Sequence, residues 1–179
     1  MSSIQGKAAR IKLLLFDVDG VLTDGRVLLH SDGTESKQFG IRDGIAMVWA
    51  QRTGLTVGFL SARSSPTTIH RAAQLGITIV YQGVVNKLDA YEQILAQQQL
   101  TGDQVAYMGD DVLDLPVLGR VGLSAAPADA VEDVRARVDW VSQSGGGGGA
   151  ARELVELIMK AQDRWDPIVA AYLGEGKQA

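Results

Sequence analysis

The chain has 179 residues, 46% of them hydrophobic, with no cysteine, two histidines and a net charge of −4. This length suits one domain with a sizeable core. The lack of cysteine excludes a disulfide framework, a thiolate metal site and a cysteine nucleophile, and two histidines exclude a three-histidine metal site. The acidic balance argues against a nucleic-acid partner, because phosphate backbones attract basic surfaces.

No apolar run reaches the roughly 20 residues that a membrane span needs, and segment 1–10 has no apolar stretch typical of a secretory signal. We therefore expect a cytoplasmic protein without a membrane partner. Segment 1–10 is interpreted as a flexible tail. Residues 163–179 are interpreted as a mobile tail, because Asp166-Pro167 should break a helix. Residues 11–162 are then the folded domain.

Apolar runs and helical patterns alternate along this domain. Strands are predicted at 11–16, 55–60, 77–81, 105–108, 121–124 and 140–141, and helices at 44–52, 66–75, 87–98, 112–118, 129–137 and 150–162. This alternation predicts an α/β fold: a Rossmann-like parallel sheet with helices on both faces. Ligands bind at the carboxyl ends of the strands in such sheets, so the residues at those ends are the candidates for function.

A β-hairpin is predicted at about 26–40, because Val27–Leu29 and Glu35–Phe39 flank an Asp-Gly turn. Its apolar residues have little core to pack on within one chain. We therefore expect them to form an interface between copies of the chain, although folding back on the chain's own sheet is an alternative.

The five glycines Gly145–Gly149 precede the last predicted helix. Their composition is typical of a flexible linker, which is the interpretation we favour. Because a helix begins directly after them, an anion-binding turn is the alternative.

Acidic residues follow two of the predicted strands. Asp17 and Asp19 come after the first strand, and Asp110, Asp111 and Asp114 come after the fourth. One such cluster could consist of turn and cap residues, which aspartate often provides. Two clusters at neighbouring strand ends should converge, and carboxylates in one crevice suit Mg²⁺.

A hydroxyl and a lysine stand at two further strand ends. Ser61 follows the second strand, and Lys87 begins the helix after the third. Taken alone, Ser61 is explained by a cap and Lys87 by a surface charge. Together with a metal and a carboxylate they suit a phosphoryl group in transfer, because the lysine offsets negative charge and the hydroxyl holds an oxygen.

In chain order, Asp17-Val18-Asp19-Gly20-Val21-Leu22-Thr23, Ser61, Lys87 and Gly109-Asp110-Asp111-x-x-Asp114 resemble the four motifs of the haloacid dehalogenase-like phosphohydrolases. The resemblance implies that Asp17 is a nucleophile that forms an aspartyl-phosphate and that Asp19 is the general acid and then the base. It implies Mg²⁺ held by Asp17, the carbonyl group of Asp19 and Asp110, with Asp111 and Asp114 as supporting acids. We expect the metal and Lys87 to keep Asp17 ionised, and crowding by carboxylates to help Asp19 hold its proton.

The chain leaves no room for a cap domain, so it is similar to the capless branch, in particular to 3-deoxy-D-manno-octulosonate 8-phosphate phosphatases. The similarity covers roughly residues 12–162; its further stretches are Phe39-Gly40-Ile41-Arg42-Asp43-Gly44, Ser61-Ala62-Arg63, Tyr81-Gln82-Gly83, Asn86-Lys87-Leu88 and Arg152-Glu153. It implies release of phosphate from this sugar acid during synthesis of the lipopolysaccharide inner core. It also implies a homotetramer in which hairpins meet centrally and a neighbour covers each active site.

Three features leave alternatives open. Ser61-Ala62-Arg63 stands where Thr-Gly-Arg is common, and phosphatases of sialic-acid-type nine-carbon sugar acids carry Glu at the position of Arg63. Arg42 and Arg63 favour the octulosonate, because a guanidinium group binds a sugar carboxylate bidentately; surface ion pairs are the alternative for both.

A non-catalytic oligomerisation module or a receiver-like module is the alternative of another class. A receiver's lysine follows its last acidic strand, whereas Lys87 precedes Asp110.

Overall fold

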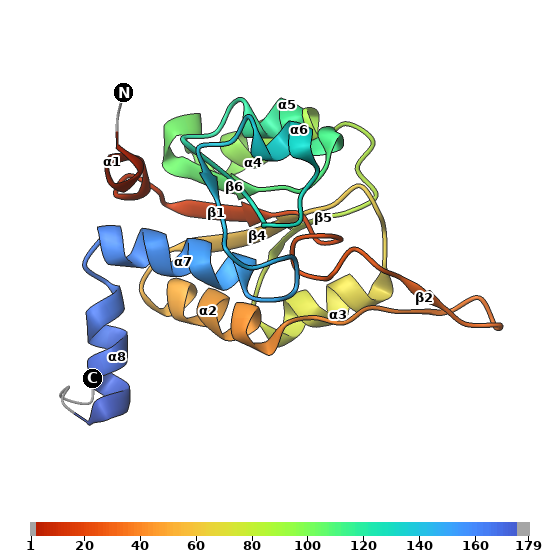
Figure 1. Cartoon of the computed structure of the whole chain (residues 1–179), viewed down its shortest axis with the longest axis horizontal. Coiled ribbons are helices and arrows are strands. Elements are labelled where there is room, and N and C mark those ends of the chain that lie inside the picture. The colour runs from red at the N-terminus through yellow and green to blue at the C-terminus, as the bar shows by residue number, and fades with distance from the viewer. Residues whose placement is uncertain (1–2, 175–179) are drawn as a thin grey trace.

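The computed structural model describes residues 3–174, which form an α/β fold around a six-stranded parallel sheet with the strand order β5-β4-β1-β6-β7-β8 (Figure 1). The strands of this sheet are β1 (Leu13–Phe16), β4 (Thr56–Leu60), β5 (Ile79–Tyr81), β6 (Val105–Met108), β7 (Leu123–Ala126) and β8 (Trp140–Val141). The helices are α1 (Ile4–Ala8), α2 (Ile41–Arg52), α3 (Pro66–Gln74), α4 (Lys87–Gln98), α5 (Leu115–Leu118), α6 (Glu132–Arg135), α7 (Ala150–Ala161) and α8 (Trp165–Leu173), with 3-10 turns at Gly102–Gln104 and Val112–Asp114. The predicted fold class is confirmed. Within the described part of the chain, no helix is long and apolar enough to cross a membrane.

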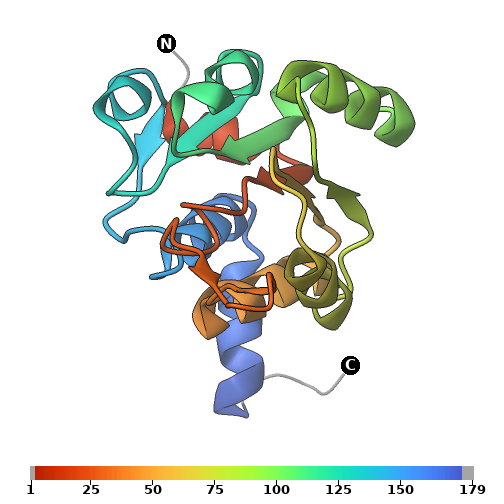
Figure 2. The same ribbon diagram turned by 90° about the vertical axis from the view of Figure 1, so that its right-hand side faces the viewer.

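Strand β1 lies inside the sheet between β4 and β6, and its side chains alternate between two cores. Leu14 and Phe16 belong to a core that contains side chains of α2 and α7, while Leu13 and Leu15 belong to a core that contains side chains of α4 and α5. Figure 2 shows the helices on both sides of the sheet. Burial on both faces explains why β1 is apolar throughout, and it fixes the position of Asp17, the residue that follows.

The predicted hairpin is present. Strands β2 (Leu28–Leu29) and β3 (Glu35–Ser36) pair antiparallel and project away from the sheet (Figure 1). Leu28 is 63% exposed and Leu29 is 72% exposed within the single chain. These two leucines are the apolar residues that a second copy of the chain could cover.

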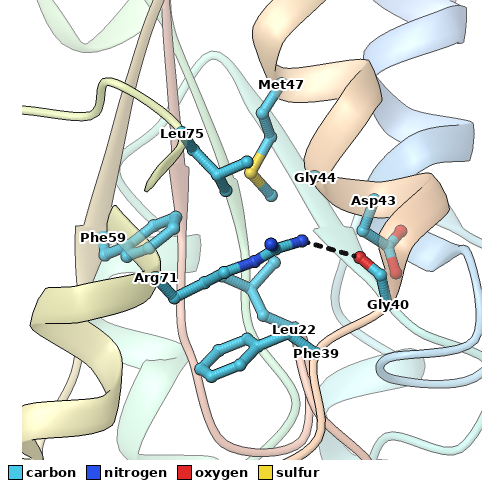
Figure 3. A pocket seen from close by; sticks show the side chains of 9 residues that line it. All are labelled: Leu22, Phe39, Gly40, Asp43, Gly44, Met47, Phe59, Arg71 and Leu75. Carbon is cyan, nitrogen blue, oxygen red and sulfur yellow. Dashed lines mark hydrogen bonds between the residues drawn. The ribbon is translucent and has the colours of Figure 1, made fainter. Parts of the chain in front are cut away.

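Phe39, which we expected on the same exposed surface, instead packs against the core at the base of the hairpin. Figure 3 shows it beside Leu22 and Arg71, in a small hollow that Phe59 also lines. The guanidinium carbon of Arg71 lies 5.9 Å from the centroid of the Phe39 ring, and its Nη2 donates to the Gly40 carbonyl at 3.2 Å. These contacts fix the chain between the hairpin and α2, which begins three residues before the predicted start.

Helices lie in both segments that we interpreted as tails, and this corrects the sequence analysis. Pro167 does not break the C-terminal helix, because it is the third residue of α8, where a proline's missing N–H group costs no helical hydrogen bond. Trp165 and Tyr172 of this helix pack edge-on against Trp49, at 5.7 and 5.8 Å between ring centroids. Helix α1 is held by an ion pair between Lys7 and Asp139. The remaining tail residues, 1–2 and 175–179, lie outside the described residues.

The Gly145–Gly149 segment is a tightly packed turn, so the flexible-linker interpretation is wrong. A Cβ atom on Gly146 would lie 2.0 Å from the carbonyl oxygen of Gly20, so only glycine allows the two segments to approach this closely. Gly147 donates its N–H to the carbonyl of Val21 at 2.9 Å. The glycines therefore support the loop that follows β1.

The alternative interpretation of Gly145–Gly149 was an anion-binding turn at the start of α7. In the structure, the carboxylate of Asp43 lies at this helix start. Its Oδ1 accepts from the backbone N–H of Arg152 at 2.9 Å, which also ties α2 to α7. A carboxylate of the chain itself thus accepts a hydrogen bond from a backbone N–H group in the first turn of α7.

Candidate active site

Asp17 and Lys87 meet at the carboxyl edge of the sheet, as the sequence predicts. Asp17 continues the line of β1 and donates its N–H to the carbonyl of Met108 at 3.0 Å. Lys87 is the first residue of α4, and its Nζ lies 3.0 Å from Oδ2 of Asp17. Both side chains are largely buried, so the lysine faces the carboxylate where little water screens their attraction.

Asp114 holds Lys87 from the other side. Its fully buried carboxylate lies with Oδ1 2.6 Å from Lys87 Nζ, while Oδ2 accepts from the backbone N–H groups of Asp110 and Asp111 at 2.9 and 3.2 Å. Tyr107, on β6, donates its hydroxyl to the same Oδ1 atom. Tyr107 was not predicted from the sequence, because an aromatic residue inside an apolar strand carries no sign of a polar contact.

Asp110 brings a third carboxylate to the site. One oxygen each of Asp17, Asp110 and Asp114 lies within 4.8 Å of the others. Oδ1 of Asp110 is buried and, among the described residues, has no hydrogen-bond partner. A Cβ atom on Gly20 would lie 2.0 Å from Oδ2 of Asp110, so the loop after β1 passes directly against this carboxylate.

The crowding of these acids raises their pKa values. Burial, followed by the charge of Asp114, raises the pKa of Asp17 to about 7, although Lys87 opposes the shift. Burial and then the charges of Asp17 and Asp114 raise the pKa of Asp110 to about 8. The charge of Lys87 lowers the pKa of Asp17 by less than burial and Asp114 raise it, so the lysine alone does not keep Asp17 fully ionised. A cation between Asp17 and Asp110 would do so, and the unpartnered Asp110 oxygen fits one.

Asp19 lies at the rim of the same site, but its surroundings differ from our expectation. We expected neighbouring carboxylates to crowd it. Instead, Lys37 Nζ lies 2.8 Å from both of its carboxylate oxygens, and Arg63 Nε lies 3.4 Å from Oδ2. Arg63 also contacts Glu35, at 2.9 Å. Lys37 and Glu35 were not predicted as site residues, because lysine and glutamate in a hairpin usually face solvent.

The site residues line one hollow of about 240 Å³. Its lining comprises Asp17, Asp19, Gly25, Ser61, Ala62, Arg63, Lys87, Asp110, Asp111, Leu113 and Asp114. Ser61 directly follows β4, as predicted, and its side chain is buried. Asp111 caps the 3-10 turn Val112–Asp114 by accepting from the backbone N–H of Val112 at 2.6 Å. Arg42 is not brought to this hollow; it lines a separate surface hollow with Arg152 and Glu156.

Comparisons with known proteins agree with this geometry. Residues 59–154 match the family model of haloacid dehalogenase-like hydrolases. The chain is 41% identical to the 3-deoxy-D-manno-octulosonate 8-phosphate phosphatase KdsC of Escherichia coli (strain K12) over 165 residues, which cover 92% of this chain and 88% of the relative.

Two solved structures of 3-deoxy-D-manno-octulosonate 8-phosphate phosphatases are also similar. The one from Yersinia pestis has a TM-score of 0.90 and 41% identity, with 91% of this chain and 88% of that chain covered. The one from Moraxella catarrhalis, in complex with magnesium, phosphate and a KDO molecule, has a TM-score of 0.92 and 36% identity, with 94% and 97% covered. The chain therefore belongs to the haloacid dehalogenase-like hydrolases.

Proposed function

We propose that this chain hydrolyses 3-deoxy-D-manno-octulosonate 8-phosphate to the free sugar acid and inorganic phosphate. The observation that carries the proposal is the convergence of Asp17, Lys87, Asp110 and Asp19 in one hollow. Relatives that match over most of both chains carry this activity in their names. A receiver-like module is not favoured, because its lysine follows its last acidic strand, whereas Lys87 begins α4 and precedes β6. A purely structural module is not favoured either, because the relatives are named as phosphatases.

Asp17 is the proposed nucleophile. Its carboxylate attacks phosphorus to form an aspartyl-phosphate, and the bond from phosphorus to the sugar oxygen breaks. Asp19 donates a proton to that leaving oxygen and then takes one from the water that attacks the aspartyl-phosphate. Lys87 offsets charge on the phosphoryl oxygens, and the buried hydroxyl of Ser61 is placed to hold one of them.

Mg²⁺ is the proposed cofactor, and Asp17 and Asp110 are its proposed side-chain ligands, with the carbonyl group of Asp19 as the third protein ligand. The oxygens of Asp114 already accept from Lys87 and from backbone N–H groups, so we assign this residue a supporting role, together with Asp111. The magnesium ion in the Moraxella catarrhalis relative supports this choice of metal. When bound, the ion supplies positive charge to the phosphoryl group and keeps Asp17 ionised.

Arg63 is the proposed partner of the sugar carboxylate, because it lines the hollow and half of its side chain is exposed. Arg42 can take part only at the site of a neighbouring chain, since it lies outside the hollow of its own. A homotetramer joined through the exposed hairpin leucines would provide such neighbours and would cover each site. We also propose that the enzyme acts in the cytoplasm, on the route to the lipopolysaccharide inner core.

A phosphate-release screen over sugar phosphates tests this proposal. We expect Mg²⁺-dependent turnover with the highest kcat/KM on 3-deoxy-D-manno-octulosonate 8-phosphate. A nine-carbon sugar-acid 9-phosphate is the matched comparison, because it offers the same carboxylate and phosphate on a longer chain. Higher kcat/KM on the nine-carbon substrate would contradict the proposed substrate. Absence of turnover on every sugar phosphate would contradict the proposed phosphatase activity.

A further inference from the structure

Two side chains of the hairpin reach the site. Glu35 begins β3 and Lys37 follows this strand, so the two residues are spaced to point to the same side of the segment. Lys37 contacts both oxygens of Asp19 at 2.8 Å, and Glu35 Oε2 accepts from Arg63 Nη2 at 2.9 Å. The hairpin is therefore joined to the catalytic hollow of its own chain by two ion pairs.

Lys37 differs from Arg63 in how firmly it is held. The Lys37 side chain is 0% exposed, whereas that of Arg63 is 52% exposed and is shared between Asp19 and Glu35. A buried ammonium group needs a paired charge, because burial without one is costly. Within the described residues, Asp19 is the one acid within 4.0 Å of Lys37 Nζ. Lys37 thus has a single, fixed partner, while Arg63 can turn to a substrate.

We propose that Lys37 is the positioning residue of Asp19, holding the carboxyl group in the orientation from which it protonates the leaving oxygen. The inference rests on the proposed function, since it takes Asp19 as the general acid. Lys37 Nζ lies 2.8 Å from both oxygens of Asp19 and so fixes the plane of this carboxyl group at the edge of the hollow that Asp19 lines. The bond from Asp17 to phosphorus forms as the bond from phosphorus to the sugar oxygen breaks, and the proton passes from Asp19 to that oxygen. Lys37 itself transfers no proton.

The dependence of kcat/KM on the leaving group distinguishes a positioning role of Lys37 from a role in stabilising the fold alone. An alkoxide leaves poorly without a proton, whereas p-nitrophenolate is a stabilised anion that leaves with little help from an acid. A misplaced Asp19 should therefore impair hydrolysis of the sugar phosphate and largely spare p-nitrophenyl phosphate. The ratio kcat/KM is the proper measure, because it covers only the steps up to loss of the leaving group.

The experiment compares the wild type, Lys37→Met, Lys37→Arg and Lys7→Met on both substrates. For Lys37→Met we expect a loss of roughly 10- to 100-fold in kcat/KM on the octulosonate phosphate, and of less than about threefold on p-nitrophenyl phosphate. Lys37→Arg keeps the cation and should recover most of the loss. Lys7→Met is the matched control, since it removes a lysine–aspartate pair that lies away from the hollow.

Equal losses on the two substrates would overturn the positioning role while leaving the proposed function intact. A wild type that hydrolyses neither substrate would overturn both. Because Lys37→Met leaves Asp19 without its buried partner, this variant can fail to fold, and the double variant Asp19→Asn/Lys37→Met then provides the test. If Lys37 acts through Asp19, the double variant should have the same kcat/KM as Asp19→Asn alone. A further loss of about tenfold or more would contradict the proposal.

Discussion

Among residues 3–174, Lys87 is the one cation that contacts Asp17, with 3.0 Å between Nζ and Oδ2, and it shares its charge with Asp114. Asp110 adds a third carboxylate within 4.8 Å. One lysine therefore faces three acids before any phosphate arrives, and a phosphate group adds further negative charge. This imbalance is the physical reason to expect that the site works only with a cation.

The pH dependence of stability should reveal this cation. In the metal-free chain the pKa of Asp17 is raised to about 7 and that of Asp110 to about 8, so the folded state keeps protons that the unfolded state releases near pH 4. Because the folded state binds more protons in this range, its stability falls as the pH rises from about 4 to about 8. A bound Mg²⁺ ion replaces these protons. Thermal melting with Mg²⁺ and with EDTA should therefore show a larger Tm gain at about pH 8 than at about pH 5. An equal Tm gain at about pH 5 and about pH 8 would contradict the expected coupling between Mg²⁺ binding and the release of protons from Asp17 and Asp110.

Asp17→Asn should abolish turnover, because an amide cannot form the acyl-phosphate bond. The asparagine keeps the size of the side chain and removes one of the crowded charges. The fold should therefore persist, and the metal-free protein should melt no earlier than the wild type at about pH 8. Phosphate release measures the first effect and circular dichroism the second. Near-normal turnover in this variant would exclude a covalent intermediate at Asp17.

Tyr107→Phe should weaken the support of Lys87 rather than remove a reacting group. The Tyr107 hydroxyl lies 3.3 Å from Lys87 Nζ and donates to Asp114, within a fully buried network. Loss of this hydroxyl leaves the acceptor Oδ1 with the lysine alone and should cost about 1–3 kcal/mol of unfolding free energy. Urea unfolding measures this loss, and kcat should fall by less than it does for a change at Lys87 itself. Unchanged stability would mean that water replaces the hydroxyl.

Some of these features could be predicted from the sequence, and others could not. The β1 strand and the positions of Asp17, Lys87 and Asp110 follow from local patterns, because parallel strands bring their carboxyl ends to one edge. Lys37 could not be predicted, since its burial depends on how the hairpin folds back onto Asp19. The course of α8 was also missed, because its stability comes from Trp49, more than a hundred residues earlier in the chain.

The exposed leucines of the hairpin, Leu28 and Leu29, predict an oligomer in which these side chains are buried between copies of the chain. If the protein forms the proposed tetramer, Leu28→Ser with Leu29→Ser should shift it towards a monomer, because these two side chains are 63% and 72% exposed in the single chain. Light scattering at micromolar concentration measures the mass. His30→Ser, next to the pair, is the matched control and should keep the assembly. A wild-type mass near 19.1 kDa would rule out the tetramer.

Arg63→Ala should change selectivity among substrates rather than the chemistry at Asp17. If Arg63 binds the sugar carboxylate, its loss should remove a charge-assisted contact of about 1.5–3 kcal/mol, or roughly 10- to 150-fold in kcat/KM on the octulosonate phosphate. Hydrolysis of p-nitrophenyl phosphate should hold steady. Because Arg63 also lies 3.4 Å from Asp19, a neutral sugar phosphate is needed as a third substrate.

This third substrate has an alkoxide leaving group but no carboxylate. A loss confined to the sugar acid supports carboxylate binding, whereas equal losses on both sugar phosphates would show that Arg63 acts through Asp19. Arg42→Ala provides the comparison within the same chain, since Arg42 lies outside the hollow. Arg42→Ala should lower kcat/KM on the octulosonate phosphate only while the assembly is intact. In the Leu28→Ser/Leu29→Ser background, Arg42→Ala should cause no further loss of kcat/KM. An effect that persists in the monomer would contradict a role for Arg42 at a neighbour's site.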